Sequence, residues 1–203
     1  MKQLIILSAF FYSLVIRAES TIDEDNFIDY LSATSFFSAS FVQKTYSNSL
    51  ERKVIGQIKA NRKGMFKLTY EEPMNEVIVS DGFNLHRFDP ELEQLDIQAL
   101  ENLLDETPMG LFSSNPDALK KLFSVSSCVN LPEFLRCQLE AKTEESYLKT
   151  IVVQVSNDLI TGIRYIYAFD QNVLLKFSEI SNKTILDNEF HFIIPEGIDI
   201  VRH

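Results

Sequence analysis

Short runs in which apolar and polar residues alternate occupy most of the chain from Phe37 onward, and turn residues separate them. Such alternation places the apolar residues on one face of a strand. The strongest short hairpin signal is Asp81-Gly82, between VIVS and NLHRFD, and the last run is EFHFIIP at residues 189–195. The runs predict about ten or eleven strands, most of them joined as consecutive hairpins. An antiparallel sheet of this size must curl, so the chain is expected to be mainly β, with a strongly curved sheet.

Helical patterns occur at two places in this β-rich chain. Residues 21–37 begin with a capping box, Thr21 and Glu24, and continue with apolar residues at helical spacing. Between about residues 96 and 123 the spacing is helical again, and Asn115-Pro116-Asp117 is typical of a helix start. The sequence therefore predicts one N-terminal helix and one or two helices inserted midway.

The first eighteen residues have the features of a secretory signal. Lys2 gives a positive start, and the apolar run from Leu4 to Ile16 is too short to span a bilayer comfortably. Cleavage after Ala18 would leave residues 19–203, with no cysteine at the new terminus to carry a lipid. The remainder contains no linker, repeat or second composition regime. We expect a single exported domain, monomeric and without a transmembrane segment.

The charge balance restricts the partners. The formal charge is −10, and it becomes −12 when Lys2 and Arg17 are removed with the signal. An acidic surface repels nucleic acid and anionic lipid headgroups. We therefore expect neither as a general partner.

Two cysteines, Cys128 and Cys137, remain in the exported chain. In an oxidising compartment such a pair can form a disulfide, and its spacing suits a bond across one hairpin with Pro132 near the turn. A redox role would favour a Cys-x-x-Cys spacing, which is missing. The sequence predicts a structural disulfide.

Asp81, His86 and Asp89 are the best candidates for a metal or acid/base site, because they lie close together in the chain. However, both aspartates fall in predicted turns, and the three histidines of the chain do not have the spacing of zinc ligands. There is no G-x-S-x-G motif and no glycine-rich phosphate loop. The sequence predicts no enzyme, no metal and no cofactor.

Arg62 does not fit the pattern of a surface charge. On its strand it shares a face with Val54, Gly56, Ile58 and Ala60, so the alternation carries the guanidinium to the apolar side. An unpaired buried charge costs several kcal/mol. Two explanations are open: the side chain extends from the rim into water, or it donates to acceptors placed for it.

Five segments together resemble a known family, the periplasmic outer-membrane lipoprotein carriers called LolA. In chain order they are SFFSASFVQK, GQIKANRKGMFKL, VIVSDGFNLHRFDPELEQ, ETPMGLFSSN and FHFIIPEGIDI. The resemblance covers essentially the whole mature chain, although residues 124–180 match only by strand pattern. It implies an incomplete, strongly curved antiparallel β-barrel whose open side is covered by helices, with an apolar cavity between.

The resemblance also implies a function. Such carriers receive acylated lipoproteins from an inner-membrane transporter of the LolCDE type, cross the periplasm, and deliver them to an outer-membrane acceptor of the LolB type. No covalent chemistry is involved. Fatty chains gain about 0.8 kcal/mol per buried CH₂, so a carrier needs a shielded interior that can still release them.

The resemblance assigns roles to particular residues. Arg62 matches an arginine that holds the lid closed by hydrogen bonds to helix carbonyls, and Phe66 matches an aromatic that matters for transfer. The lid is the segment ETPMGLFSSN, residues 106–115, which makes the Phe112 and Ser113 carbonyls the expected acceptors. The expected acyl-chain site comprises Phe41, Ile58, Ala60, Phe66, Leu68, Val79 and Leu85 from the sheet, with Met109, Leu111 and Phe112 from the lid.

The chain also departs from the family pattern. It has Arg62-Lys63 where Arg-Pro is common, and Leu68 and His86 where tryptophans are common. The cysteine pair is not part of the general pattern. Two rival functions remain: a related module that binds lipid or senses lipoproteins without shuttling them, and an exported hydrolase using Asp81, His86 and Asp89. A LolB-type acceptor is disfavoured, because the chain lacks the cysteine that would be lipidated.

Overall fold

The structure is a computed structural model that describes residues 26–47, 50–71, 73–100, 104, 107–144, 146–167 and 171–203. The predicted signal segment, residues 1–18, and the capping pair Thr21 and Glu24 lie outside these ranges. The described residues form one sheet of twelve strands, accompanied by three α-helices and one 3₁₀ helix. None of the helices in the described ranges is long and apolar enough to cross a membrane.

The elements follow one another in an order close to the predicted one. The helices are α1 (Phe27–Ala33), α2 (Gly110–Ser113), α3 (Pro116–Leu122) and the 3₁₀ helix η1 (Asp187–Phe190). The first six strands are β1 (Phe36–Ser47), β2 (Leu50–Asn61), β3 (Met65–Tyr70), β4 (Val77–Asp81), β5 (Asn84–Asp89) and β6 (Gln94–Ala99). The other six are β7 (Phe123–Asn130), β8 (Leu135–Ala141), β9 (Leu148–Ser156), β10 (Leu159–Tyr167), β11 (Asn172–Ser181) and β12 (Asp199–Arg202).

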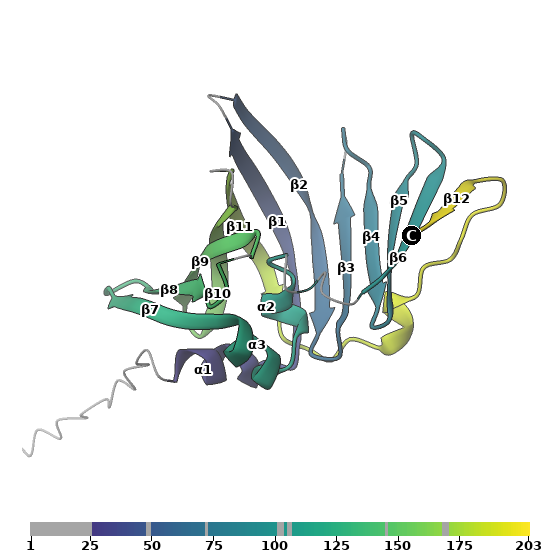
Figure 1. The fold of residues 1–203 in the computed structure, drawn as a ribbon. Helices are drawn as coiled ribbons and strands as arrows, with labels where there is room; N and C mark the ends of the chain where they lie inside the picture. Colours follow the sequence, from purple (N-terminus) through teal and green to yellow (C-terminus); the bar gives the residue numbers. More distant parts are fainter. Residues whose placement is uncertain are drawn as a thin grey trace, which may run out of the picture.

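Two series of hairpins meet in the middle of the sheet. Strands β1 to β6 are neighbours in chain order, as are β7 to β11, and β1 pairs with β11 to join the two series. The sheet ends at β7 on one side and at β12 on the other, so it curls without closing. Figure 1 shows β7 to β10 turned toward the concave face of β1 to β6, with α2 inside the curve and α1 and α3 at its lower end.

The core lies on the concave face. Along β1, for example, Phe37, Ala39 and Phe41 are buried, while Ser38 and Ser40 between them are less so. The same alternation fills the interior from both halves of the sheet, and residues of all three α-helices join this core. The expected curved, mainly β fold with helices over its open side is confirmed.

Two predicted elements were wrong, one at the end of the first strand series and one after the second series. Residues 94–99, of which 96–99 were expected to be helical, form β6, and EFHFIIP forms η1 followed by chain without regular structure. Two strands were not predicted, β6 and β12, and they pair parallel with each other. On β6 the apolar residues Leu95, Ile97 and Ala99 alternate with polar ones, so the pattern of a strand was present in the sequence and the helical prediction overlooked it. EFHFIIP failed as a strand because its aromatic residues lie across the sheet surface rather than pairing with an edge.

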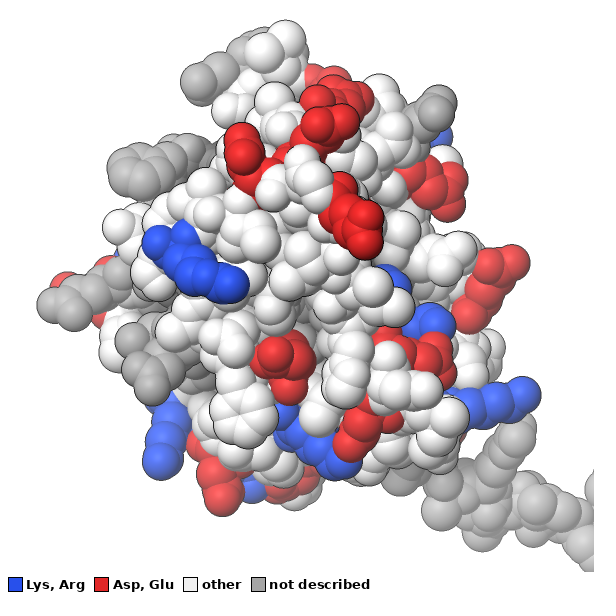
Figure 2. Space-filling view, turned by 90° about the vertical axis from the view of Figure 1, so that its right-hand side faces the viewer, with Lys and Arg blue, Asp and Glu red and all other residues white. Residues whose placement is uncertain are grey.

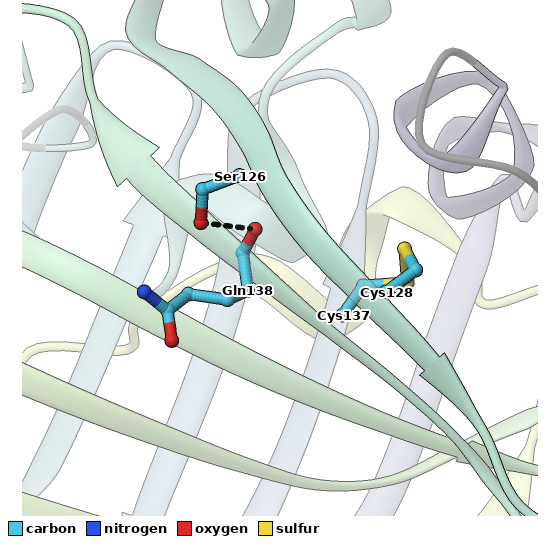
Figure 3. The surroundings of a disulfide bond; sticks show 4 residues. All are labelled: Ser126, Cys128, Cys137 and Gln138. Atoms are coloured by element: carbon cyan, nitrogen blue, oxygen red, sulfur yellow. Dashed lines mark hydrogen bonds between the residues drawn. A yellow bond between two sulfur atoms is a disulfide. The ribbon is translucent and has the colours of Figure 1, made fainter.

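A disulfide joins β7 and β8, the two strands at one edge of the sheet. Cys128 on β7 lies directly opposite Cys137 on β8, and the two are bonded. Figure 3 shows this bond on one side of the hairpin, with the Gln138 side chain projecting to the other side and its carbonyl accepting a hydrogen bond from the Ser126 hydroxyl. Cys137 is fully buried, so this end of the core is closed by a covalent link.

Candidate functional site

The walls of the candidate site come from the concave face of β1 to β5. Alternation directs one side chain in two inward, and six of the seven predicted wall residues follow this rule. Phe41, Ile58, Ala60, Phe66 and Leu68 are at most 7% exposed and belong to the core, while Leu85 is partly buried against it. The structure brings these six predicted wall residues together.

The seventh predicted wall residue, Val79, lies on the other face. It sits opposite Lys67 and His86 in the register, and residues directly opposite one another point to the same side of a sheet. Val79 is fully buried there, beneath the C-terminal segment that includes η1. Both faces of β4 are covered, so burial alone could not tell which side of the strand lines the interior. The prediction of Val79 as a cavity residue was wrong.

The lid fills the interior. Met109, Leu111 and Phe112 are at most 5% exposed. The Phe112 ring stacks on Phe37, with 4.4 Å between the ring centroids, and meets the edge of Phe177 at 5.8 Å. These contacts close the space between the two halves of the sheet. The structure is therefore that of a closed lid.

A small apolar hollow remains beside the lid. Its volume is about 210 Å³, and its apolar lining includes Phe66, Ile78, Leu85 and Leu100. Arg87 contributes a polar boundary. The hollow continues the wall formed by the predicted residues, so it marks where the interior can expand if the lid moves.

Tyrosines from β3 and β10 make another part of the interior. Burial raises the pKa of Tyr70 to about 12, with smaller contributions from Glu76 and Tyr167. Burial also raises the pKa of Tyr165, whose ring packs against Tyr167 with 5.3 Å between centroids. These phenols are uncharged at neutral pH, so they keep the interior without a negative charge.

Arg62 follows directly after β2 and connects two helices. Its Nε donates to the Thr34 carbonyl at 3.0 Å, and Nη2 donates to the Leu31 carbonyl of α1 at 2.5 Å. Its Nη1 donates to the carbonyls of Leu111 at 2.6 Å and Ser114 at 3.2 Å. All four acceptors are main-chain oxygens at the ends of short helices, where carbonyls lack partners within the helix. The guanidinium therefore joins α1 to the lid.

The acceptors of Arg62 differ from the expected carbonyls of Phe112 and Ser113. The Ser113 carbonyl instead accepts a hydrogen bond from the Gly64 amide at 3.0 Å, in the turn after Arg62. Carbonyls one turn apart in a helix point in similar directions, so Leu111 and Ser114 can both reach one guanidinium. The acceptors on α1 were missed because no sequence pattern indicated that this helix lies beside the lid.

Burial and hydrogen bonding act in opposite directions on the Arg62 guanidinium. Burial lowers the pKa of its guanidinium to about 10, so it remains a cation at neutral pH. Burying a charge is costly, and the four hydrogen bonds offset that cost. We call this set of contacts the Arg62 latch.

A second arginine, Arg87, lies on the same face of the sheet as the interior, but its side chain is 56% exposed, and its position was not predicted from the sequence. Arg87 shares the inner face of β5 with Leu85, and its Nε donates to the carboxylate of Glu76, which is 4% exposed. The ion pair raises the pKa of Arg87. The parity argument used for Arg62 applies equally here, so the pattern of β5 could have identified it.

The predicted hydrolase residues do not form a catalytic arrangement. Asp81 accepts hydrogen bonds from the amides of Phe83 and Asn84, and Asp89 accepts from those of Glu91 and Leu92, so both carboxylates stabilise turns. The His86 ring stacks on Phe192 on the outer face. Across the described ranges, no group of three metal-ligating side chains converges.

Sequence comparisons agree with this architecture. The family model described as outer membrane lipoprotein carrier protein LolA matches residues 32–193. A protein from Hahella chejuensis named outer-membrane lipoprotein carrier protein is 31% identical over 170 residues, covering 82% of this chain and 81% of its own. A protein of the same name from Chromohalobacter salexigens is 29% identical over 175 residues, covering 85% and 83%.

Solved structures share the fold at low sequence identity. An uncharacterised conserved protein from Thermus thermophilus has a TM-score of 0.56 at 10% identity, covering 88% of this chain and 98% of its own. A LolA superfamily protein from Nitrosomonas europaea has a TM-score of 0.52 at 11% identity, covering 84% and 98%. With the family match over most of its length, the chain belongs to the LolA family of outer membrane lipoprotein carrier proteins.

Proposed function

We propose that this protein is a periplasmic carrier that shields the acyl chains of lipoproteins in its apolar interior while they cross the periplasm. It receives cargo from an inner-membrane transporter of the LolCDE type and delivers it to an outer-membrane acceptor of the LolB type. It acts by reversible binding and catalyses no reaction. The relatives that carry the name lipoprotein carrier support this role.

The observation that carries the proposal is an apolar interior closed by a lid, whose carbonyls accept hydrogen bonds from the partly buried guanidinium of Arg62. The lid side chains occupy space that acyl chains would need, and Phe112 is 2% exposed there. Moving the lid would exchange one set of apolar contacts for another, so the net gain on loading is smaller than the full value of about 0.8 kcal/mol per buried CH₂. A site of this kind binds without retaining its cargo permanently.

The latch gives the lid two arrangements. Closed, the guanidinium bonds four carbonyls from α1 and the lid. With acyl chains in the interior, α2 is displaced and these bonds are replaced by water. Return of the latch then favours release of cargo to the acceptor. A ligand shifts such an equilibrium only by its differential affinity for the two states.

The test is transfer of a triacylated lipoprotein by the Arg62→Leu variant. Spheroplasts containing the inner-membrane transporter are incubated with the purified chain, and the released complex is then mixed with outer-membrane vesicles containing the acceptor. We expect the wild-type chain to release and deliver the lipoprotein. The variant is expected to fold and to load, but to deliver at most about a tenth as much, because closure no longer regains the latch bonds.

Lys63→Gln is the matched control. It removes the adjacent cation, whose side chain is 62% exposed and pairs with Asp187 on the surface. Such pairs contribute little, so transfer should be unchanged. Normal delivery by Arg62→Leu would disprove the latch, and failure of the wild-type chain to release any lipoprotein would disprove the carrier function. Recovery of only free lipid with the purified chain would favour the rival lipid-binding module.

A further inference from the structure

A large hollow lies on the side of the sheet opposite the acyl-chain site. Its volume is about 720 Å³, and it crosses the outer face of β7 to β11. Val152 and Arg164 line it and face each other in the register, while their neighbours Ile151, Val153 and Ile163 are buried in the core. Because adjacent residues of a strand point to opposite faces, the hollow is separated from the interior by the sheet itself.

Three cations line this hollow, each from a different strand: Arg136 of β8, Arg164 of β10 and Lys176 of β11. Its described lining residues include no aspartate or glutamate. Within the described ranges, none of the three cations forms an ion pair. Glu140 accepts a hydrogen bond from Gln138 at the border of the hollow and does not line it. This is a concentration of unpaired positive charge in a chain with net charge −10.

Uncharged side chains hold the two arginines. Arg136 donates to Gln154 at 3.1 Å and its guanidinium lies 4.7 Å from the centre of the Phe134 ring. Arg164 donates from Nε to Asn172 at 2.9 Å, which leaves its two Nη groups for a ligand. Amide partners orient a guanidinium without neutralising it. Less side-chain entropy is then lost when a carboxylate binds.

The floor between the cations is partly apolar, since Val152 and Leu174 line it together with the amides of Gln138 and Gln154. Val152 and Leu174 lie on either side of Arg164 in the register. Gly162 has no side chain to occupy the space, and an added Cβ would lie 3.0 Å from the Leu175 carbonyl. The hollow can therefore accept apolar side chains as well as carboxylates.

We propose that this hollow, lined by Arg136, Arg164 and Lys176, is a docking site for an extended acidic segment of a partner protein that carries apolar residues between its carboxylates. Charge complementarity favours an acidic occupant, and the cations around a partly apolar floor suit a chain of alternating character. A bilayer surface is a poorer fit, because a flat array of headgroups cannot enter a recess. Figure 2 shows another face of the molecule, at the β6 and β12 end of the sheet. Its charge differs from that of the hollow, because acidic side chains gather in its upper part and both signs mix below.

The experiment measures binding of a fluorescein-labelled peptide of alternating glutamate and leucine to the full chain by fluorescence anisotropy. We expect binding at low ionic strength that weakens as salt is added, since the charges are solvent-exposed. The triple variant Arg136→Gln, Arg164→Gln, Lys176→Gln should weaken binding at least tenfold. Thermal unfolding of each variant confirms that it folds.

A second triple variant controls for net charge. Lys121→Gln, Lys183→Gln and Arg202→Gln remove three exposed cations outside the hollow, and binding should stay within about twofold. Equal loss in both triple variants, or equal binding of a glutamine and leucine peptide, would overturn the proposal. The proposal would also be overturned if vesicles containing phosphatidylglycerol bound the chain in a way that needed the three cations, while the acidic peptide did not bind. Lipoprotein release from spheroplasts, which tests the carrier function, is a separate readout.

Discussion

At the scale of single residues, the latch depends on the shape of the Arg62 side chain as well as on its charge. A guanidinium presents five N–H groups in a rigid plane, and four hydrogen bonds from it reach carbonyls on two helices. A lysine ammonium is a compact point donor that cannot span the same acceptors. The role should therefore be lost on substitution by lysine, although the charge is kept.

For Arg62→Lys we expect the lid to open more often in the unliganded protein. At least two carbonyls lose their donor, and each bond to a charged group contributes about 1.5 kcal/mol or more. Amide hydrogen exchange of Phe112, Ser113 and Ser114 should accelerate at least tenfold, as measured by mass spectrometry of peptides from this segment. Lys63→Arg serves as the control and should leave exchange unchanged. Equal exchange in Arg62→Lys and the wild type would show that charge alone holds the lid.

Asp81 illustrates how a residue that resembled a catalytic acid serves the fold. Partial burial tends to raise its pKa, but the amides of Asn84 and Phe83 and the nearby His86 hold the pKa below its usual value of 3.8. A carboxylate with a lowered pKa stabilises the folded state above its unfolded pKa, and this contribution is lost as the pH falls through the folded value.

We therefore expect Asp81→Ala to cost about 1 kcal/mol of unfolding free energy, the usual net value of such hydrogen bonds. Denaturant titrations should find this difference constant between pH 5 and 8 and shrinking below about pH 3.8. Lipoprotein transfer should remain normal. If Asp81→Ala folded normally and yet lost all lipoprotein transfer, an acid/base role for Asp81 would have to be considered again.

At the scale of elements, the sequence predicts strands well where each has one apolar face. The alternation on β1 and β2 located Phe41, Ile58 and Ala60 in the core and placed Arg62 on the apolar side. The alternation did not show which face of β4 lines the interior, because the segment that contains η1 covers the outer face there. Val79 and Leu95 are fully buried on that face, and this cannot be known until distant segments are assembled.

The C-terminal segment is attached by a buried aromatic and by surface ion pairs. Phe190 is 0% exposed in η1, while Lys59 of β2 and Lys63 in the turn after it pair with Glu189 and Asp187. The ion pairs are exposed and contribute little. The segment therefore depends mainly on the burial of Phe190.

Phe190→Ala should reduce the free energy of unfolding by about 3 to 5 kcal/mol, the usual cost of removing a buried phenylalanine ring. Ile193→Ala, just beyond η1 and 88% exposed, should change it by less than about 0.5 kcal/mol. Urea unfolding measures both. A small effect of Phe190→Ala would mean that the segment is not a stable part of the outer face.

The disulfide stabilises the opposite end of the sheet. It closes a loop with a sequence separation of 9 between β7, an edge strand, and β8. By the chain-entropy model a loop of this length contributes about 2 to 3 kcal/mol, chiefly by restricting the unfolded chain. We expect Cys128→Ala with Cys137→Ala to lower the free energy of unfolding by this amount, as measured in urea. Reduction of the wild type with dithiothreitol should have a comparable effect, whereas the double variant should not respond to reductant.

At the scale of the whole molecule, the two faces of the curled sheet are built differently. The concave face holds an apolar interior that the closed lid occupies, and the outer face is partly covered by the C-terminal segment and partly hollowed between β7 and β11. In the carrier proposed above, the lid fills the space that acyl chains would require, so lid and cargo would compete. The apparent affinity for an acyl chain is then the intrinsic affinity reduced by the fraction of molecules that are open.

This competition predicts that weakening the lid will strengthen binding. Phe112→Ala removes the contacts of the lid ring with Phe37 and Phe177, which the closed state makes and the open state lacks. Each 1.4 kcal/mol lost from the closed state raises the apparent affinity tenfold while the open form stays rare, so a fluorescent fatty acid should bind at least about tenfold more tightly. Val79→Ala is the matched control, because it creates a cavity on the outer face, lowers overall stability and should leave fatty-acid affinity unchanged. Equilibrium titration of both variants decides the matter: weaker binding by Phe112→Ala would mean that its ring contacts the acyl chain instead of competing with it.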